Sequence, residues 1–93
     1  LFPPVKAQVV CKGAAKGFAC EVTHKQGRGP VKACWTINVD CSPAPAAMGS
    51  TCATVEPGKT KQHLLPFSDV SNAKTCSKPK GMKVVMDKVE AAP

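Results

Sequence analysis

Residues 34–41 read CWTINVDC and carry the clearest structural signal in the chain. In this stretch Trp35, Ile37 and Val39 alternate with polar side chains. Because successive side chains of a β-strand point to opposite faces of a sheet, such alternation is typical of a strand with one buried and one solvated face. We therefore predict that this segment is a strand lying on the core of an all-β protein.

Weaker two-residue alternation recurs along the rest of the chain, between frequent turn signals. One of these is Pro57-Gly58, a turn pair that ends the predicted strand TCATVE. Nine prolines and seven glycines interrupt the sequence, and no sustained helical stripe is present. The stretch PFSDVSNAK, residues 66–74, predicts only a single helical turn in a loop, which Ser68 could cap. The other predicted strands lie in VKAQVVC, GFACEVTH, TCATVE, KTKQHLLPF and MKVVMDKV, the last strand running over residues 83–89.

Short strands separated by regular turns indicate an antiparallel β-sandwich of roughly six to seven short strands. The 93 residues suit one domain, residues 1–93, whose ends, residues 1–4 and 90–93, we expect to be loose. Its inner layer is predicted to contain Val9, Phe18, Val22, Trp35, Ile37, Val39, Val55, Leu64 and Val84.

Six cysteines, at positions 11, 20, 34, 41, 52 and 76, indicate that disulfides stabilise this sandwich. An even number of cysteines in a short chain is typical of a disulfide framework in a secreted or periplasmic protein. The first residues, LFPPV, lack an initiator methionine, as expected of a mature exported form. No closely spaced cysteine pair supports a zinc site, and His24 and His63 lie far apart, so we predict no metal and no cofactor.

The chain is basic, with thirteen Lys and Arg against six acidic residues and a net charge of +7. Residues 33–58 contain no Lys or Arg, so the positive charge is concentrated in residues 6–32 and 59–88. This favours an anionic partner, either a protein or an anionic glycan surface. The lysines occur singly and without interleaved aromatic residues, which argues against nucleic acid. No apolar run is long enough to span a membrane, and nothing indicates the oligomeric state.

The stretch CEVTHKQGRGPVKAC, residues 20–34, is predicted to be a hairpin with Arg28 at its tip. Gly27 and Gly29 would supply the positive φ angles that a tight hairpin requires. The backbone requirement alone explains the glycines. Whether Arg28 is a contact residue or only an exposed turn residue therefore stays open.

Six cysteines allow many complete pairings, and the pattern leaves them open. Cys20 and Cys34 flank the predicted hairpin, but the pleat places them on opposite faces unless a bulge intervenes. Cys11 and Cys41 both lie at inward positions of their strands, which would suit an internal bridge.

The segment CATVEPG, residues 52–58, resembles the Cys-x4-Pro-Gly segment of the tendamistat-type α-amylase inhibitors, which are small secreted β-sandwich proteins. The interval from Cys34 to Cys52 and the length of the predicted hairpin are also similar, and the resemblance spans residues 20 to about 76. It implies a tendamistat-like sandwich, beside the Ig-like one that strand pattern alone allows, and an inhibitory role for Arg28. It also implies bridges Cys20–Cys34 and Cys52–Cys76, which leaves Cys11–Cys41 as the third.

No nucleophile elbow, P-loop, dinucleotide fingerprint or zinc-protease helix is present, so we predict that the protein is not an enzyme. The leading hypothesis is a secreted or periplasmic, non-catalytic binding protein with a basic surface. One alternative is a secreted enzyme inhibitor that presents Arg28, and another is a cationic antimicrobial or toxin-like protein. The candidate binding residues are Lys25, Arg28, Lys32, Lys59 and Lys61.

Overall fold

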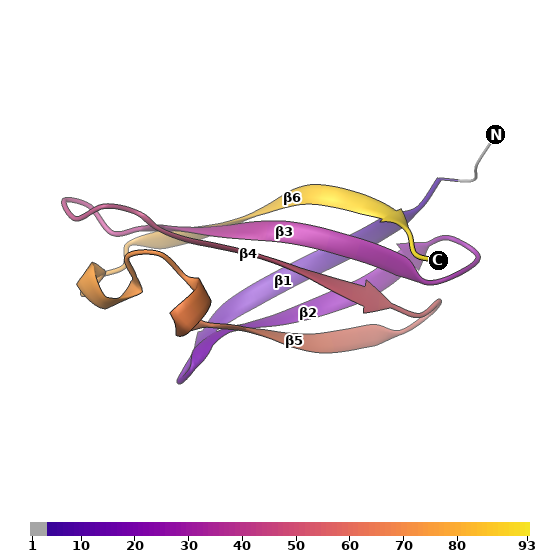
Figure 1. Ribbon diagram of the computed structural model, residues 1–93, viewed down its shortest axis with the longest axis horizontal. Helices are drawn as coiled ribbons and strands as arrows, with labels where there is room; N and C mark the ends of the chain where they lie inside the picture. The colour runs from indigo at the N-terminus through magenta and orange to yellow at the C-terminus, as the bar shows by residue number, and fades with distance from the viewer. Residues whose placement is uncertain (1–3) are drawn as a thin grey trace.

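The computed structural model describes residues 4–93 and consists of two packed three-stranded antiparallel sheets (Figure 1). The first sheet has the order β1-β2-β5 and the second the order β4-β3-β6. The predicted all-β, disulfide-bonded sandwich is therefore confirmed, with six strands. The strands are β1 (Lys6–Ala14), β2 (Gly17–Gln26), β3 (Val31–Asp40), β4 (Ala47–Val55), β5 (Thr60–Pro66) and β6 (Gly81–Ala91).

The stretch with the clearest alternation lies in β3, the central strand of the second sheet. β3 pairs with β4 on one side and with β6 on the other, so both of its backbone edges are hydrogen-bonded. Trp35 and Ile37 are fully buried and Val39 nearly so, whereas Thr36 points to the opposite, outer face. A central strand packed on the core by one face is the setting that produces strict alternation.

The core between the sheets contains most of the predicted inner residues. Val22, Trp35, Ile37, Val39 and Val55 are buried, and Val9, Phe18 and Val84 pack against them in partly buried positions.

The prediction for Leu64 is wrong, because this side chain is 45% exposed while Leu65 is 1% exposed. β5 pairs with β2 so that Leu65 is opposite Phe18 and His63 is opposite Cys20, and residues opposite each other share a face. The doublet Leu64-Leu65 contains no alternation that could have revealed this register.

The segment after β2 is not the predicted hairpin. β2 and β3 belong to different sheets, so residues 27–30 cross from one sheet to the other. Of the two glycines only Gly27 has a positive φ, 138°, and a Cβ there would lie 3.1 Å from a Val5 methyl carbon. The predicted turn at Pro57-Gly58 is present, with Gly58 at φ 72° and the Lys59 amide donating to the Glu56 carbonyl at 3.1 Å.

All six cysteines are paired, but the predicted pairs Cys20–Cys34, Cys52–Cys76 and Cys11–Cys41 are all wrong. Cys20 points into the core from the first sheet, whereas Cys34 lies on the outer face of the second, so the two cannot meet. Two bridges instead join cysteines that are directly opposite each other on paired strands. The three bridges are Cys11–Cys20, Cys34–Cys52 and Cys41–Cys76.

The segment between β5 and β6 contains two short 3₁₀ turns, η1 (Phe67–Asp69) and η2 (Ala73–Thr75). The predicted cap by Ser68 is wrong, because Pro66 precedes η1 and no side chain caps it. The last strand continues to Ala91, so residues 90 and 91 belong to the sheet, while most of the other predicted loose end, residues 1–3, lies outside the described residues. No helix among the described residues is long and apolar enough to cross a membrane.

Candidate functional site

The five candidate binding residues lie at one end of the elongated molecule, whose principal extents are 47 × 24 × 18 Å. At this end β2 finishes and β3 begins, and the turn between β4 and β5 lies beside them (Figure 1). Their gathering follows from the topology, since antiparallel strands bring residues 25–32 and 59–61 to the same end. We call Lys25, Arg28, Lys32, Lys59 and Lys61 the basic end.

His24 anchors the loop that carries Arg28. Its side chain is only 8% exposed, and its Nε2–H donates to the Gly29 carbonyl at 2.9 Å. Its backbone amide donates to the Lys59 carbonyl at 3.0 Å, which joins the Arg28 loop to the neighbouring β4–β5 turn. Arg28 itself is exposed. The loop is therefore a short, fixed connection that presents an arginine to solvent.

The sequence did not reveal the anchoring role of His24. In a hairpin this residue would be partly solvated, but the crossing between sheets buries its ring beneath residues 27–29. Only knowledge of the strand pairing could have identified it.

Two further lysines of the basic end lie on either side of Thr54. Lys61 Nζ donates to the Thr54 carbonyl at 3.3 Å, reaching from the first sheet to the second. Lys32 is opposite Thr54 in the pairing of β3 with β4, and it is half-buried. The cationic surface thus spans both sheets.

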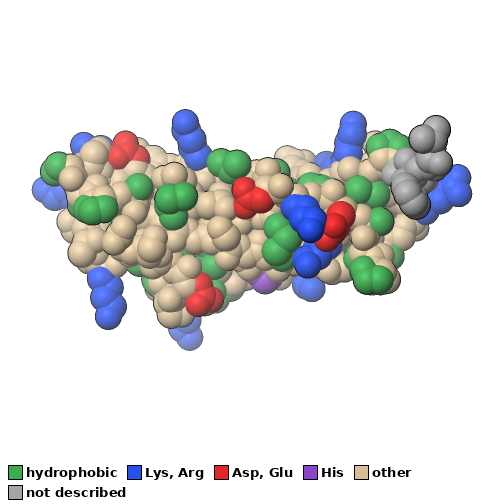
Figure 2. Space-filling model, turned by 45° about the horizontal axis from the view of Figure 1, so that its top comes forward, with side chains coloured by type: hydrophobic (Ala, Val, Ile, Leu, Met, Phe, Trp, Pro, Cys, Tyr) green, Lys and Arg blue, Asp and Glu red, His purple; other side chains and the backbone are tan. Residues whose placement is uncertain are grey.

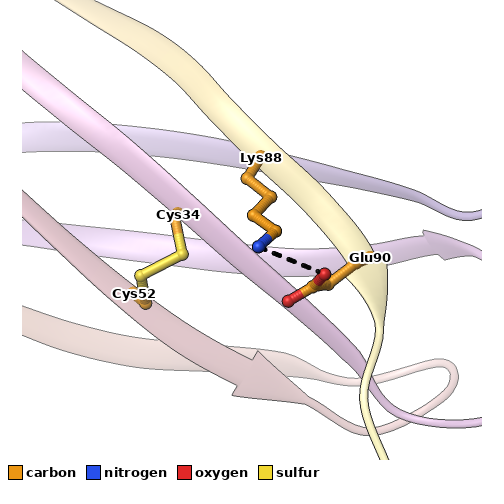
Figure 3. Close-up of polar contacts among 4 residues, drawn as sticks. All are labelled: Cys34, Cys52, Lys88 and Glu90. Atoms are coloured by element: carbon orange, nitrogen blue, oxygen red, sulfur yellow. Dashed lines mark ion pairs between the residues drawn. A yellow bond between two sulfur atoms is a disulfide. The ribbon is translucent and has the colours of Figure 1, made fainter.

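Two acidic residues lie near the basic end: Glu56 in the β4–β5 turn, and Glu90, which is opposite Lys32 in the pairing of β3 with β6. Glu90 forms an ion pair with Lys88 at 3.4 Å, beside the Cys34–Cys52 bridge on the outer face of the second sheet (Figure 3). This is the only ion pair among residues 4–93. The five basic-end side chains therefore have no carboxylate at ion-pair distance within the described chain.

Basic side chains are not restricted to this end. Figure 2 shows Lys and Arg side chains projecting from both ends of the molecule, with acidic side chains among them. The opposite end also has an apolar groove of about 520 Å³, beside η1 and the start of β6. No sequence pattern indicated this groove, because its lining comes from several separate segments.

His63 lies between the sheets, away from the basic end loops. Its Nε2 and Thr51 Oγ1 are hydrogen-bonded at 2.8 Å, and its ring meets the Trp35 ring edge to face, with centroids 5.4 Å apart. Burial lowers the pKa of His63 below its ordinary 6.5, and the charge of Lys61 lowers it further. The interior therefore favours the neutral imidazole.

This lowered pKa predicts a loss of stability in weak acid. As the pH falls through 6.5 the unfolded chain takes up a proton at His63 before the folded protein does, so the free energy of unfolding decreases. The loss ends once the pH is below the lower pKa of the folded state. Chemical denaturation of the wild type and of His63→Gln between about pH 7 and about pH 5 measures this contribution.

The difference between the two proteins should grow with acidity in favour of the variant. The pKa of Asp40 is lowered by its hydrogen bonds from Ser42, so its contribution is lost only below the ordinary 3.8 and lies outside this window. Identical pH dependence of the two proteins would show that His63 is not buried in its neutral form.

Comparisons with models of protein families, with curated proteins and with solved structures give no match.

Proposed function

We propose that the protein is a non-catalytic binding protein that holds an anionic polysaccharide through the basic end. The observation that carries this proposal is that all five candidate residues, from separate segments, meet at one end without carboxylate partners. Three disulfides are typical of proteins from oxidising compartments, which supports a secreted or periplasmic location.

A polysaccharide suits this surface better than a protein partner does. Strong protein interfaces are centred on buried aromatic anchors, and no Phe or Trp belongs to the basic end. Lysine presents a compact charge on a flexible stem, which can follow a chain of evenly spaced carboxylates or sulfates without fixed geometry. Such contacts are long-ranged and weaken as salt is added.

The test compares two triple variants with the same change in net charge. Lys25→Gln/Lys59→Gln/Lys61→Gln removes charge from the basic end, and Lys74→Gln/Lys78→Gln/Lys83→Gln removes it from the segment and strand at the other end. Binding of dextran sulfate is measured for each, with neutral dextran and poly-glutamate as the other probes. Exposed ion pairs contribute about 0.2–1 kcal/mol each, so the first variant should bind roughly tenfold more weakly.

Affinity is also measured between about 0.01 and 0.1 M salt, over which the Debye length falls from roughly 30 to 10 Å. A steep decrease for the wild type and a shallower one for the first triple variant are expected. Equal losses of affinity for dextran sulfate in both triple variants would show that binding depends on net charge alone and would contradict a site at the basic end. Preference for poly-glutamate over dextran sulfate would favour an acidic protein surface instead.

The second candidate function is an enzyme inhibitor that inserts Arg28. The fixed attachment of the loop by His24 favours it, because a preorganised loop loses less conformational entropy on insertion. The glycines beside Arg28 provide no side chains to fill a cleft. A loss of about 2 kcal/mol or more from Arg28→Ala, with little salt dependence, would replace polysaccharide binding with this function.

A further inference from the structure

The groove at the end opposite the basic end has a wall built mainly from apolar side chains. Its lining includes Phe18, Val39, Ala47, Phe67, Cys76 and Met82. Its volume of about 520 Å³ is within the usual range of small-molecule sites, roughly 300–1,000 Å³. The surface it offers is far smaller than the roughly 800 Å² per partner of a stable protein interface, so the dimensions suit a small ligand.

The groove is held in shape by contacts within the chain. The rings of Phe18 and Phe67 meet edge to face with centroids 5.7 Å apart. The Cys41–Cys76 bridge fixes the end of η2 against the end of β3. Gly13 lines the other side, and a Cβ at this position would meet nothing within 4 Å, so the space above it is open.

Two large apolar side chains of the groove remain accessible to solvent. Phe67 is 41% exposed and Met82 is 36% exposed, although both lie beside buried residues of the core. Covering them with an apolar chain would remove this surface from water, at about 25 cal/mol for each Å² covered. Burial of Phe67 and Met82 would therefore contribute favourably to the free energy of binding an apolar group.

The charged group at the groove is a lysine. Lys80 is the only charged residue in the lining, and its backbone amide donates to the Asp40 carbonyl at 2.8 Å, which fixes its position. The Asp40 carboxylate accepts hydrogen bonds from Ser42 N at 3.0 Å and Ser42 Oγ at 2.7 Å. These hydrogen bonds are the main cause of the lowered pKa of Asp40, and the charge of Lys80 contributes a smaller part, so the Lys80 ammonium lies near this carboxylate. Among residues 4–93 Lys80 forms no ion pair, so its ammonium group is still able to pair with an anion.

The other lysines at this end lie outside the groove. Lys83 is opposite Asn38, on the outer face of the second sheet, and Lys12 lines a separate hollow together with Glu21. Lys80 therefore supplies the positive charge at the groove. A ligand that only filled the apolar wall would leave this charge unused, and a cationic ligand would be repelled.

We propose that this groove binds a single-chain amphiphile with a carboxylate head, that is, a medium- or long-chain fatty acid. The acyl chain lies against Phe18, Phe67 and Met82, and the carboxylate pairs with Lys80. This site is separate from the basic end and requires neither the polysaccharide nor Arg28.

The test is an NMR titration of the full chain with decanoate and with decyltrimethylammonium, each below its critical micelle concentration. The two probes share an alkyl chain and differ in the sign of the head group. Decanoate should shift the amide resonances of Gly13 and Gly81, which line the groove, and leave those of Gly27 and Gly58 unchanged. We expect decyltrimethylammonium to bind at least about tenfold more weakly, because its head group cannot pair with Lys80 and is repelled by it.

Matched variants distinguish binding in the groove from nonspecific hydrophobic binding elsewhere on the surface. Phe67→Ser should weaken decanoate binding by about tenfold, while Leu64→Ser, at an equally exposed apolar residue outside the groove, should leave it unchanged. Met82→Ser, on β6, is a second variant that keeps the test decisive if Phe67→Ser does not fold. Lys80→Gln should reduce the preference for decanoate, and Lys61→Gln, which removes one charge at the other end, should not.

The proposal is overturned if both amphiphiles bind equally, or if Gly27 and Gly58 shift as much as Gly13 and Gly81. It is also overturned if shifts appear only when micelles form, or if Phe67→Ser and Leu64→Ser weaken binding to the same extent. None of these results depends on whether the basic end binds a polysaccharide, because the probes carry no polymeric charge.

Discussion

Replacement of Trp35 by alanine is expected to lower the free energy of unfolding by about 3–5 kcal/mol. The indole is fully buried at the centre of β3, in the middle of the core that both sheets share. Its removal leaves a cavity that the hydrogen-bonded strands on either side cannot close. Urea denaturation followed by circular dichroism measures the loss without relying on the fluorescence of this single tryptophan.

Trp35→Phe is the control for this experiment. Among the described residues Trp35 Nε1 has no hydrogen-bond partner, so the phenyl ring sacrifices no hydrogen bond and should cost clearly less than alanine. A loss below about 1 kcal/mol for Trp35→Ala would contradict the burial of the ring, since large losses come from cavities in the core.

Removal of the Cys41–Cys76 bridge, as Cys41→Ala/Cys76→Ala, is expected to cost about 3–4 kcal/mol. This bridge has the largest sequence separation of the three, 35 residues, and therefore restricts the unfolded chain most. It also joins the end of β3 to η2, where no strand pairing replaces it. Chemical denaturation of the variant, with thiol counting to confirm the two remaining bridges, measures the loss.

The matched variant is Cys34→Ala/Cys52→Ala, which removes a bridge between neighbouring strands that β-pairing already holds together. Both variants should lose stability, but only loss of Cys41–Cys76 should also impair decanoate binding, because that bridge fixes the groove. Unchanged stability without Cys41–Cys76 would show that η2 is held by its other contacts.

The sequence predicted those parts of the fold that depend on local pattern. The alternation around Trp35 identified a strand with one buried face, and Pro57-Gly58 identified a turn. The pairing of strands could not be read in the same way. A glycine with positive φ serves a hairpin and a crossing between sheets equally well, so Gly27 gave no indication that β2 and β3 belong to different sheets.

The wrong disulfide pairs came from the resemblance to the tendamistat-type inhibitors, which requires residues 20–34 to form a hairpin that joins Cys20 to Cys34. Because β2 and β3 lie in different sheets, each of these cysteines pairs with a cysteine of its own sheet. The residues of the basic end could be predicted, because the distribution of charge along the sequence pointed to them. Their meeting at one end required the topology. The groove could not be predicted from the sequence, because Phe18, Phe67 and Met82 come from distant segments that share no sequence pattern.

The order of strands also determines when the fold can be completed. β3 obtains its second neighbouring strand only from β6, where Asp40 is opposite Gly81 and Val31 is opposite Ala91. β2 likewise obtains its second neighbouring strand only from β5. Each sheet thus requires the closure of long loops, which makes folding slow relative to proteins with local contacts. A chain synthesised from its N-terminus can pair β1 with β2 and β3 with β4 early, because these strands are consecutive. The second sheet is complete only when residues 81–91 have been made, so until then one backbone edge of β3, the strand that contains Trp35, has no partner.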